Sequence, residues 1–281
     1  MPEGHTIHRH ARLQGRVLGG KPLRSLSPQG RFDDGAAIID RQTLRRVEPL
    51  SKHLLYHFTR DVVHVHLGMH GRFRGLYRGD DGGHPLGLGE DGWPAPTGAV
   101  RWRFVSPKAG RGYDLSGPTS CKVVDGGFVT ELRERIGPDL LAPDAMQRLP
   151  EVWDNLRTRR VGLGVALMDQ SLISGIGNAY RAELLYRARI HPDTPCRDVD
   201  ADAFARLYAD SVYLLNIGVR HRHILCVEPE AVGKRGWRDL ADDERFWVYR
   251  RERCRGCGAE VEEAQRAGRA VFWCPREQAM P

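Results

Sequence analysis

The chain has no long apolar run. None of its hydrophobic stretches reaches the roughly 18 residues that a membrane-spanning helix requires. The first twelve residues are largely polar and carry three histidines and two arginines, so we expect no signal peptide. Internal repeats and low-complexity segments are absent as well. Together these absences argue against an integral membrane protein and against a repeat array.

Disulfide bonds are not indicated either, although the sequence has six cysteines. Three of them are scattered, and Cys254, Cys257 and Cys274 cluster near the carboxyl end. Without an export signal we expect a reducing compartment. In such a compartment the cluster is better explained by metal binding than by disulfides.

Acidic residues are fewer than basic residues. The 36 Asp and Glu residues are outnumbered by 43 Lys and Arg residues, which gives a formal net charge of +7. A soluble protein with this excess of cations commonly binds a polyanion, most often nucleic acid. The simpler alternative is a basic surface without such a partner. The 281 residues, 41% of them hydrophobic, suffice for two domains with buried cores.

Along the chain the period of the hydrophobic pattern changes. From about residue 20 to 125, apolar and polar residues alternate, which indicates half-buried strands of an antiparallel β domain. From about residue 145 to 220 the pattern is helical. The individual elements that we expect are a short helix over residues 3–13, strands at 63–67 and 100–104, and a helix for which Asp200 is the N-cap.

These changes divide the chain into four segments. We expect a β domain over residues 1–125, a linker or hinge over 126–150, a helical domain over 151–245 and a compact tail over 246–281. The hinge contains Gly137-Pro138, a turn signal after which no long strand pattern resumes.

The segment Gly175–Leu185 carries the first chemical signal. Glycines at 175 and 177 favour a tight turn, and Asn178 can cap the helix that begins there. Such a turn presents free backbone N–H groups and the positive end of the helix dipole, which suits a phosphate. With an upstream helix over residues 164–170, the arrangement is helix–two turns–helix. It is either a phosphate-binding turn or an ordinary helix hairpin.

The second signal is the spacing Cys254-x2-Cys257-x16-Cys274-x2-Glu277. Two such knuckles typically hold one tetrahedral Zn²⁺. Glu277 stands where a fourth cysteine is expected, and zinc accepts carboxylate oxygen, so Glu277 is a candidate ligand. A metal-free finger is the alternative. Between the knuckles we expect a β-hairpin with residues 268–269 near its tip.

The third signal is the amino terminus, Met1-Pro2-Glu3. If Met1 is removed, which the small Pro2 permits, the chain begins with a secondary amine whose pKa is about 7.7–8.0. A free amine can attack a sugar aldehyde carbon and form a Schiff base. Glu3 could move protons at the same carbon. On its own, such a start carries no functional meaning.

These features occur together, and in the same order, in one family. Pro2-Glu3-Gly4, the segment Gly175–Leu185 and the terminal cysteine knuckles resemble the Fpg/Nei DNA glycosylases, that is, formamidopyrimidine-DNA glycosylase and endonuclease VIII. The resemblance covers nearly the whole chain. The opening Pro-Glu-Gly-His-Thr and the segment Asp114–Thr119 are more similar to Nei than to Fpg, and specifically to actinobacterial Nei proteins.

The resemblance implies a fold and a partner. The fold is α+β: an N-terminal β-sandwich with an N-terminal helix, then a helix–two-turn–helix domain that ends in a zinc-finger-like β-hairpin with structural Zn²⁺. The partner is double-stranded DNA with damaged bases or abasic sites. We expect a monomer that binds no membrane and acts in the bacterial cytoplasm, at the nucleoid.

The resemblance also implies roles for individual residues. Pro2 would be the nucleophile at the deoxyribose C1′, and Glu3 the general acid/base that helps to open the sugar ring. Lys52, on a β-turn, would contact a phosphate next to the lesion. Asn178 and the finger residue Arg269 would hold the same backbone. Considered alone, Lys52 or Arg269 would be an ordinary surface cation.

Met69 matches the residue that fills the gap left by a flipped base. The alternative for Met69 is a buried core methionine. Other gap-filling residues cannot be assigned, and Arg101 and Arg103 are only candidates. Thr6 departs from the family pattern, because many members carry a second glutamate at this position.

The implied function is that of a bifunctional DNA glycosylase/AP lyase of base-excision repair. It would remove oxidised bases, preferably pyrimidines, through a Schiff base to Pro2 and then β,δ-elimination. Two alternatives stay open, one within this class of enzymes and one outside it. One is Fpg-like removal of oxidised purines, or a specialised AP lyase. The other is a non-catalytic protein that binds damaged DNA, although a pure binder has no need of a terminal secondary amine.

Overall fold

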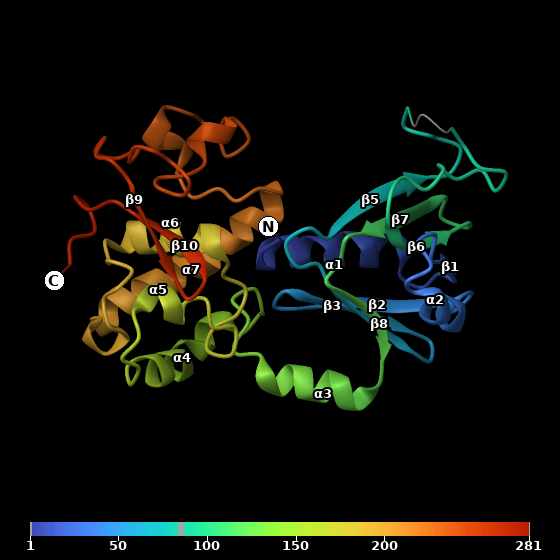
Figure 1. Cartoon of the computed structure of the whole chain (residues 1–281), viewed down its shortest axis with the longest axis horizontal. Coiled ribbons are helices and arrows are strands. Elements are labelled where there is room, and N and C mark those ends of the chain that lie inside the picture. The colour runs from blue at the N-terminus through green and yellow to red at the C-terminus, as the bar shows by residue number, and fades with distance from the viewer. Residues whose placement is uncertain (1, 84–86, 281) are drawn as a thin grey trace. The chain divides into compact units, whose positions relative to one another are not determined.

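The computed structural model describes residues 2–83 and 87–280 (Figure 1). Met1, whose removal the proposed amine chemistry requires, lies outside the described residues. No helix in the described ranges is long and apolar enough to cross a membrane.

The chain divides into two compact units. Unit 1 comprises Pro2 and residues 7–133, and unit 2 comprises residues 3–6 and 134–280. The first boundary falls inside helix α1 (Gly4–Leu18), and the second falls inside helix α3 (Gly126–Arg135). The finer division at residues 125, 150 and 245 stays a prediction.

Unit 1 consists of two four-stranded antiparallel sheets, as the alternating pattern predicted. One sheet has the order β1-β6-β7-β5 and the other β2-β3-β4-β8 (Figure 1). The helix α2 spans Asp33–Ile39. The strands are β1 (Arg24–Leu26), β2 (Leu44–Leu50), β3 (His53–Phe58), β4 (Val62–His66), β5 (Arg72–Tyr77), β6 (Val100–Ser106), β7 (Arg111–Ser116) and β8 (Ser120–Val124).

The core of unit 1 joins α1 to both sheets. Apolar residues of α1, β3, β4, β6 and β7 form one buried cluster. At its centre the Trp102 ring stacks on Phe104, with ring centroids 4.0 Å apart, and meets Tyr56 edge-on at 5.0 Å. The Trp102 indole N–H donates to Ser25 Oγ at 3.0 Å, so the polar atom of this buried side chain is satisfied. The unit is therefore a β-sandwich with an N-terminal helix.

Strict alternation fails in β4. It predicts His64 on a solvated face, but His64 is only 4% exposed. Two features account for its burial. The ring of Phe128, from the unpredicted helix α3, lies 5.0 Å from the His64 ring, and His53 Nδ1 lies 2.8 Å from His64 Nε2.

Unit 2 is helical and ends in a β-hairpin. Its helices pack around a core separate from that of unit 1. Asp200 caps α7 as predicted, because its Oδ1 accepts the Ala203 N–H at 2.9 Å. The elements are α4 (Leu149–Leu156), α5 (Leu163–Ala166), α6 (Asn178–Ala188), α7 (Ala201–His221), the strands β9 (Glu262–Arg266) and β10 (Arg269–Trp273), and the 3₁₀ turns η1 (Ala145–Arg148), η2 (Cys196–Asp198), η3 (Pro229–Val232) and η4 (Asp242–Glu244).

Candidate active site

The Gly175–Gly177 turn receives the beginning of the chain. Glu3 is 2% exposed, and its carboxylate accepts the backbone N–H groups of Gly177 and Ala179, both at 3.0 Å. The Gly4 N–H donates to the Gly175 carbonyl at 2.9 Å. These N–H groups lie at the first turn of α6, where backbone donors lack helical partners and the dipole favours an anion. A carboxylate from the amino terminus, rather than a phosphate, thus caps α6.

The glycines explain why this contact is possible. A Cβ atom on Gly177 would lie 2.3 Å from the Glu3 Cδ, and one on Gly4 would lie 2.8 Å from the Gly175 Cα. Gly175 itself has φ of +106°, a conformation that L side chains rarely adopt. The Gly-Ile-Gly motif is needed for the close approach of residues 3–4.

Asn178, the first residue of α6, is bound to the hairpin. Its Nδ2 donates to the Ala270 carbonyl of β10 at 2.9 Å. The Arg181 guanidinium donates to Asn178 Oδ1 and, at 2.7 Å, to the same Ala270 carbonyl. Glu3, Asn178 and the residue after Arg269 therefore converge at the start of α6.

Arg269 lies at the tip of the β9–β10 hairpin. The two turn residues, Ala267 and Gly268, have φ of 48° and 73°, which is typical of a type I′ turn. The preceding Arg266 binds Asp193 with two hydrogen bonds of 2.8 and 2.7 Å. The backbone of the tip is thus fixed from both strands while the Arg269 side chain is exposed.

Lys52 lies on the two-residue turn between β2 and β3. Its neighbour Ser51 is buried and has φ of 57°, and Leu50 pairs with His53 to close the turn. A non-glycine residue in this conformation costs energy, and such residues concentrate at functional sites. The turn presents Lys52 with little backbone freedom.

Three imidazoles lie beside this turn. The rings of His64 and His66 stack on His53, with centroids 5.1 and 4.7 Å away. Burial, and then the nearby Lys52 ammonium, lower the pKa of His66. The Lys52 charge therefore disfavours protonation of His66.

The candidates for gap filling differ in exposure. Met69 is 67% exposed, so the alternative of a core methionine is wrong. Arg103 is 4% exposed and makes two hydrogen bonds of 2.7 Å to Asp114, so it cannot enter a DNA stack. Arg101 is half-buried, and its Nε donates to Gln29 at 3.1 Å.

Glu183 has a structural role that the sequence did not indicate. It is completely buried, and its carboxylate accepts the backbone N–H groups of Trp247, Val248 and Tyr249 at 2.7–2.9 Å. Burial raises its pKa, whereas these donors oppose the rise. Glu183 binds α6 to the segment that leads into the cysteine tail. In the sequence, this role is indicated only by the presence of a charged residue, Glu183, at a core-facing position of α6.

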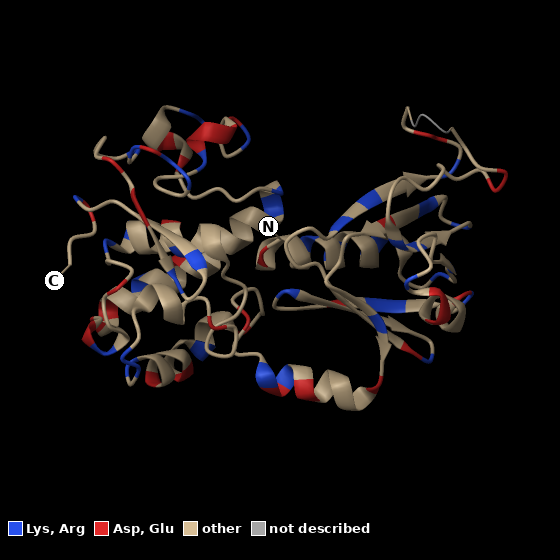
Figure 2. Ribbon diagram, in the orientation of Figure 1, with Lys and Arg blue, Asp and Glu red and all other residues tan. Residues whose placement is uncertain are grey.

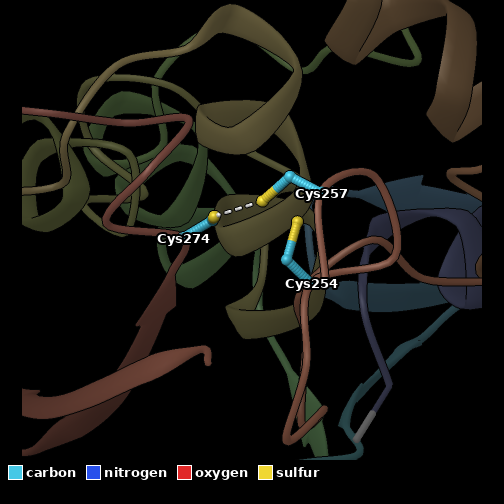
Figure 3. A group of neighbouring side chains, drawn as sticks. All are labelled: Cys254, Cys257 and Cys274. Atoms are coloured by element: carbon cyan, nitrogen blue, oxygen red, sulfur yellow. Dashed lines mark hydrogen bonds between the residues drawn. The ribbon is translucent and has the colours of Figure 1, made fainter. Parts of the chain in front are cut away.

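The thiols of Cys254, Cys257 and Cys274 converge (Figure 3). Their sulfur atoms lie within 4.8 Å of one another, and Cys257 Sγ is 3.4 Å from Cys274 Sγ. Among the described residues, no His, Asp or Glu joins this group. The Glu277 carboxylate instead binds the Arg189 guanidinium. The prediction of Glu277 as fourth ligand is therefore not supported, because its carboxylate forms an ion pair with a nearby cation.

Basic residues occur in both units (Figure 2). They lie on strands of unit 1 as well as in helices and loops of unit 2. Each unit therefore offers cations of its own to a polyanion.

Two family models match this chain. The formamidopyrimidine-DNA glycosylase N-terminal domain matches residues 1–116, and the formamidopyrimidine-DNA glycosylase H2TH domain matches residues 136–227. A relative named endonuclease 8 1, from Mycobacterium tuberculosis H37Rv, is 42% identical over 280 residues and is covered to 98%, as is this chain. The chain belongs to the Fpg/Nei family.

Other Fpg/Nei proteins agree with this assignment. The formamidopyrimidine-DNA glycosylase of Methylobacterium sp. strain 4-46 is 31% identical and covers the whole chain. The crystal structure of MutM (Fpg) from Thermus thermophilus is 25% identical, with a TM-score of 0.75 over the whole length of both chains. Lactococcus lactis Fpg in complex with DNA containing an abasic site has the same fold at 18% identity, with a TM-score of 0.77 and coverage of 99% and 100%.

Membership of the Fpg/Nei family confirms several sequence-based expectations. The β-sandwich, the helix–two-turn–helix domain and the cysteine hairpin are those of the family. Its endonuclease 8 and Fpg members are DNA glycosylase/AP lyases of base-excision repair. The three thiols fit a zinc ion as soft donors, but they supply only three of the four ligands of a structural site.

Proposed function

We propose that this protein removes oxidised bases, preferably pyrimidines, from double-stranded DNA and then cleaves the strand by β,δ-elimination. Pro2 is the nucleophile and Glu3 the acid/base. One observation carries the proposal: the backbone N–H groups of Gly177 and Ala179 fix the buried Glu3 carboxylate directly after Pro2 in the chain. A residue with a purely structural role at this position would not need a secondary amine as its neighbour.

The chemistry follows from these two groups. The Pro2 nitrogen lone pair attacks C1′ as the bond from C1′ to the damaged base breaks, and the base leaves with the bonding electrons and takes a proton from water. The Glu3 carboxylate takes up the proton that the Pro2 nitrogen loses on forming this bond, and it passes that proton to the ring oxygen as the sugar opens to an iminium ion. The iminium acidifies the C2′ protons, so loss of one proton expels the 3′ phosphate. A second elimination expels the 5′ phosphate, and water then releases Pro2.

Phosphate contacts would make the base accessible. A stacked base must be flipped out of the duplex before C1′ can be attacked, and flipping requires a firmly held backbone. Lys52 in unit 1, and Asn178 and Arg269 in unit 2, are the proposed phosphate ligands. The exposed Met69 would occupy the gap in the stack, as apolar wedges do elsewhere.

Zn²⁺, held by Cys254, Cys257 and Cys274, would have a structural role. The ion would connect the segment that precedes β9 with the residue that follows β10. In this way it would stabilise the hairpin whose tip carries Arg269. The convergence of the three thiols supports this assignment. The expected site of action is the cytoplasm, at the nucleoid.

Borohydride trapping tests the proposal. The protein is incubated with a duplex that contains one abasic site, and sodium borohydride reduces any Schiff base to a stable adduct. We expect an adduct with the wild type and none with Pro2→Gly or with protein that retains Met1. A clean wild-type preparation that gives no adduct refutes the proposal. Duplexes with an oxidised pyrimidine or an oxidised purine then decide the lesion class.

A further inference from the structure

Arg181 is a buried cation that forms no salt bridge with any described residue. It is 1% exposed, although arginine is rarely buried unless it is paired. Nη1 donates to the Gly164 carbonyl at 3.2 Å, and Nη2 donates to Asn178 Oδ1 and the Ala270 carbonyl. Within the described part of the chain its Nε has no hydrogen-bond partner. All of these acceptors are neutral.

Two other arginines, one buried and one partly buried, are paired in a different way. Arg103, also buried, binds the Asp114 carboxylate with two hydrogen bonds. Arg187, on the same helix as Arg181, binds Asp210 at 2.5 Å and Glu228 at 2.6 Å. A cation that only supports the fold is thus paired with carboxylates here. Leaving a buried cation unpaired is costly, so Arg181 requires another explanation.

Arg181 experiences opposing charges from Arg269 and Glu3. Burial, and then the charge of Arg269, lower the pKa of Arg181 to about 10, and the opposing charge of Glu3 does not offset them. The guanidinium of Arg269, which precedes the Ala270 carbonyl that Arg181 binds, therefore disfavours the charge of Arg181, whereas the Glu3 carboxylate favours it. An anion placed at this point would relieve the repulsion.

Arg181 also fixes the geometry of Asn178. A guanidinium can only donate hydrogen bonds, so the atom of Asn178 that faces it must be the carbonyl oxygen. This contact fixes which way the amide points, and Nδ2 consequently donates to Ala270. The same guanidinium binds the Ala270 carbonyl, one residue after Arg269. One buried group thus sets both proposed phosphate ligands of unit 2.

We propose that Arg181 is a positioning residue for the DNA backbone: it holds Asn178 and the β10 end of the hairpin tip in place, and the bound phosphate balances its charge. The inference rests on the proposed function, in which Asn178 and Arg269 bind phosphate. The inference adds Arg181, which would act on the phosphate only through Asn178 and Arg269.

A double-mutant cycle tests this role. The dissociation constant is measured for a duplex with one tetrahydrofuran abasic-site analogue, using the wild type, Arg181→Met, Asn178→Ala and the double variant. We expect each single variant to weaken binding by about 10- to 100-fold. The double variant should bind about as weakly as the weaker single variant, because both lose the same interaction. In turnover assays KM should rise while kcat at saturating DNA changes little.

Two further variants separate positioning from general stability. Arg187→Met removes a structural arginine from the same helix and should lower the melting temperature without changing DNA affinity. Arg181→Lys keeps the charge but not the three contacts. It should retain the salt dependence of binding, whereas Arg181→Met should lower the slope of log K against log salt by up to about 0.9.

The outcomes that contradict the proposal are distinct. If a folded Arg181→Met protein binds DNA like the wild type, or if its effect multiplies with that of Asn178→Ala, Arg181 is only structural. If Asn178→Ala and Arg269→Ala both bind like the wild type, the phosphate assignment of the proposed function is wrong instead. If Arg181→Met does not fold, the cycle is measured with Arg181→Lys and Asn178→Ala instead. If the effects of these two substitutions on the dissociation constant multiply, the proposal is again rejected.

Discussion

At the scale of single residues, Glu3 joins a structural role to the catalytic role that we propose for the same side chain. Its carboxylate satisfies two N–H groups that the first turn of α6 would otherwise leave without partners. The same contact holds the proposed acid/base in one place. A change at either partner should therefore affect stability and activity together.

Replacing Gly177 with alanine tests this coupling. The new methyl group would lie 2.3 Å from the Glu3 Cδ, so Glu3 must move and lose its hydrogen bonds. We expect a loss of about 2–4 kcal/mol in the free energy of unfolding. We also expect kcat/KM for an abasic duplex to fall about 100-fold or more, because small misplacements of catalytic groups are that costly.

Gly126→Ala is the matched control. Gly126 begins α3, and nothing lies within 4 Å of a Cβ placed there. Its stability and activity should stay near those of the wild type. Equal behaviour of the two variants would show that the Gly177–Glu3 contact does not matter.

At the scale of elements, α1 carries a titratable group in a buried position. The His10 ring lies 4.9 Å from Phe73. Burial, and then the charge of Arg9, lower its pKa from 6.5 to about 4. Between these two values the unfolded chain binds a proton that native His10 does not bind, so stability must fall as the pH falls through this window.

The expected loss is about 2–3 kcal/mol between pH 7 and pH 4. Urea unfolding of the wild type and of His10→Gln, followed at a series of pH values, measures it. The glutamine cannot take up a proton, so the difference in unfolding free energy between the two proteins should shrink toward acid pH. Parallel pH dependences would mean that His10 titrates normally in the native state.

The finger hairpin should bind metal weakly. Three thiols converge, but Glu277 binds Arg189 and does not join them. We expect less than one zinc ion per chain after dialysis against a mild chelator, by elemental analysis. Glu277→Cys restores the Cys-x2-Cys spacing and should retain stoichiometric zinc. The control Glu263→Cys adds a thiol on the exposed face of β9, outside the cysteine cluster, and should not retain stoichiometric zinc. Tight stoichiometric zinc in the wild type would contradict this expectation.

The elements that the sequence revealed are those with local signals. Asp200 caps its helix through a residue three positions away, and the Gly175–Gly177 turn depends on its own backbone. The helix α3 escaped prediction because its buried surface is small, with Leu132 as its buried residue. The roles of Arg181 and Glu183 were not predicted, since the contact of Arg181 with Ala270 spans 89 positions of the chain and those of Glu183 span 64–66. Only the folded protein brings such partners together.

At the scale of the whole molecule, the net charge of +7 favours a polyanionic partner, and the number of phosphates that the protein neutralises sets how binding depends on salt. Both units carry proposed phosphate ligands, so several counterions should leave the DNA on binding. We expect log K to fall steeply and linearly with log salt. Lys52→Ala and Arg269→Ala should each reduce the slope by about 0.9, since each removes one cation.

Asn178→Ala provides the internal comparison for that measurement. The side chain is neutral, so its removal should weaken binding at every salt concentration without changing the slope as a lost cation does. A flat plot for the wild type, or equal slope changes for all three variants, would count against the assigned phosphate contacts.

The anchoring of Glu3 also has a consequence for how the protein matures and how it is produced. Only Pro2 separates Met1 from a side chain held by the backbone N–H groups of Gly177 and Ala179, and any residue ahead of Pro2 turns the Pro2 nitrogen into an amide, which is not a nucleophile. Under the proposed chemistry, the aminopeptidase that trims nascent chains would act as an activating enzyme. Affinity tags placed ahead of Pro2 would yield a well-folded but inert protein, whereas tags at the opposite terminus would leave the nucleophile free.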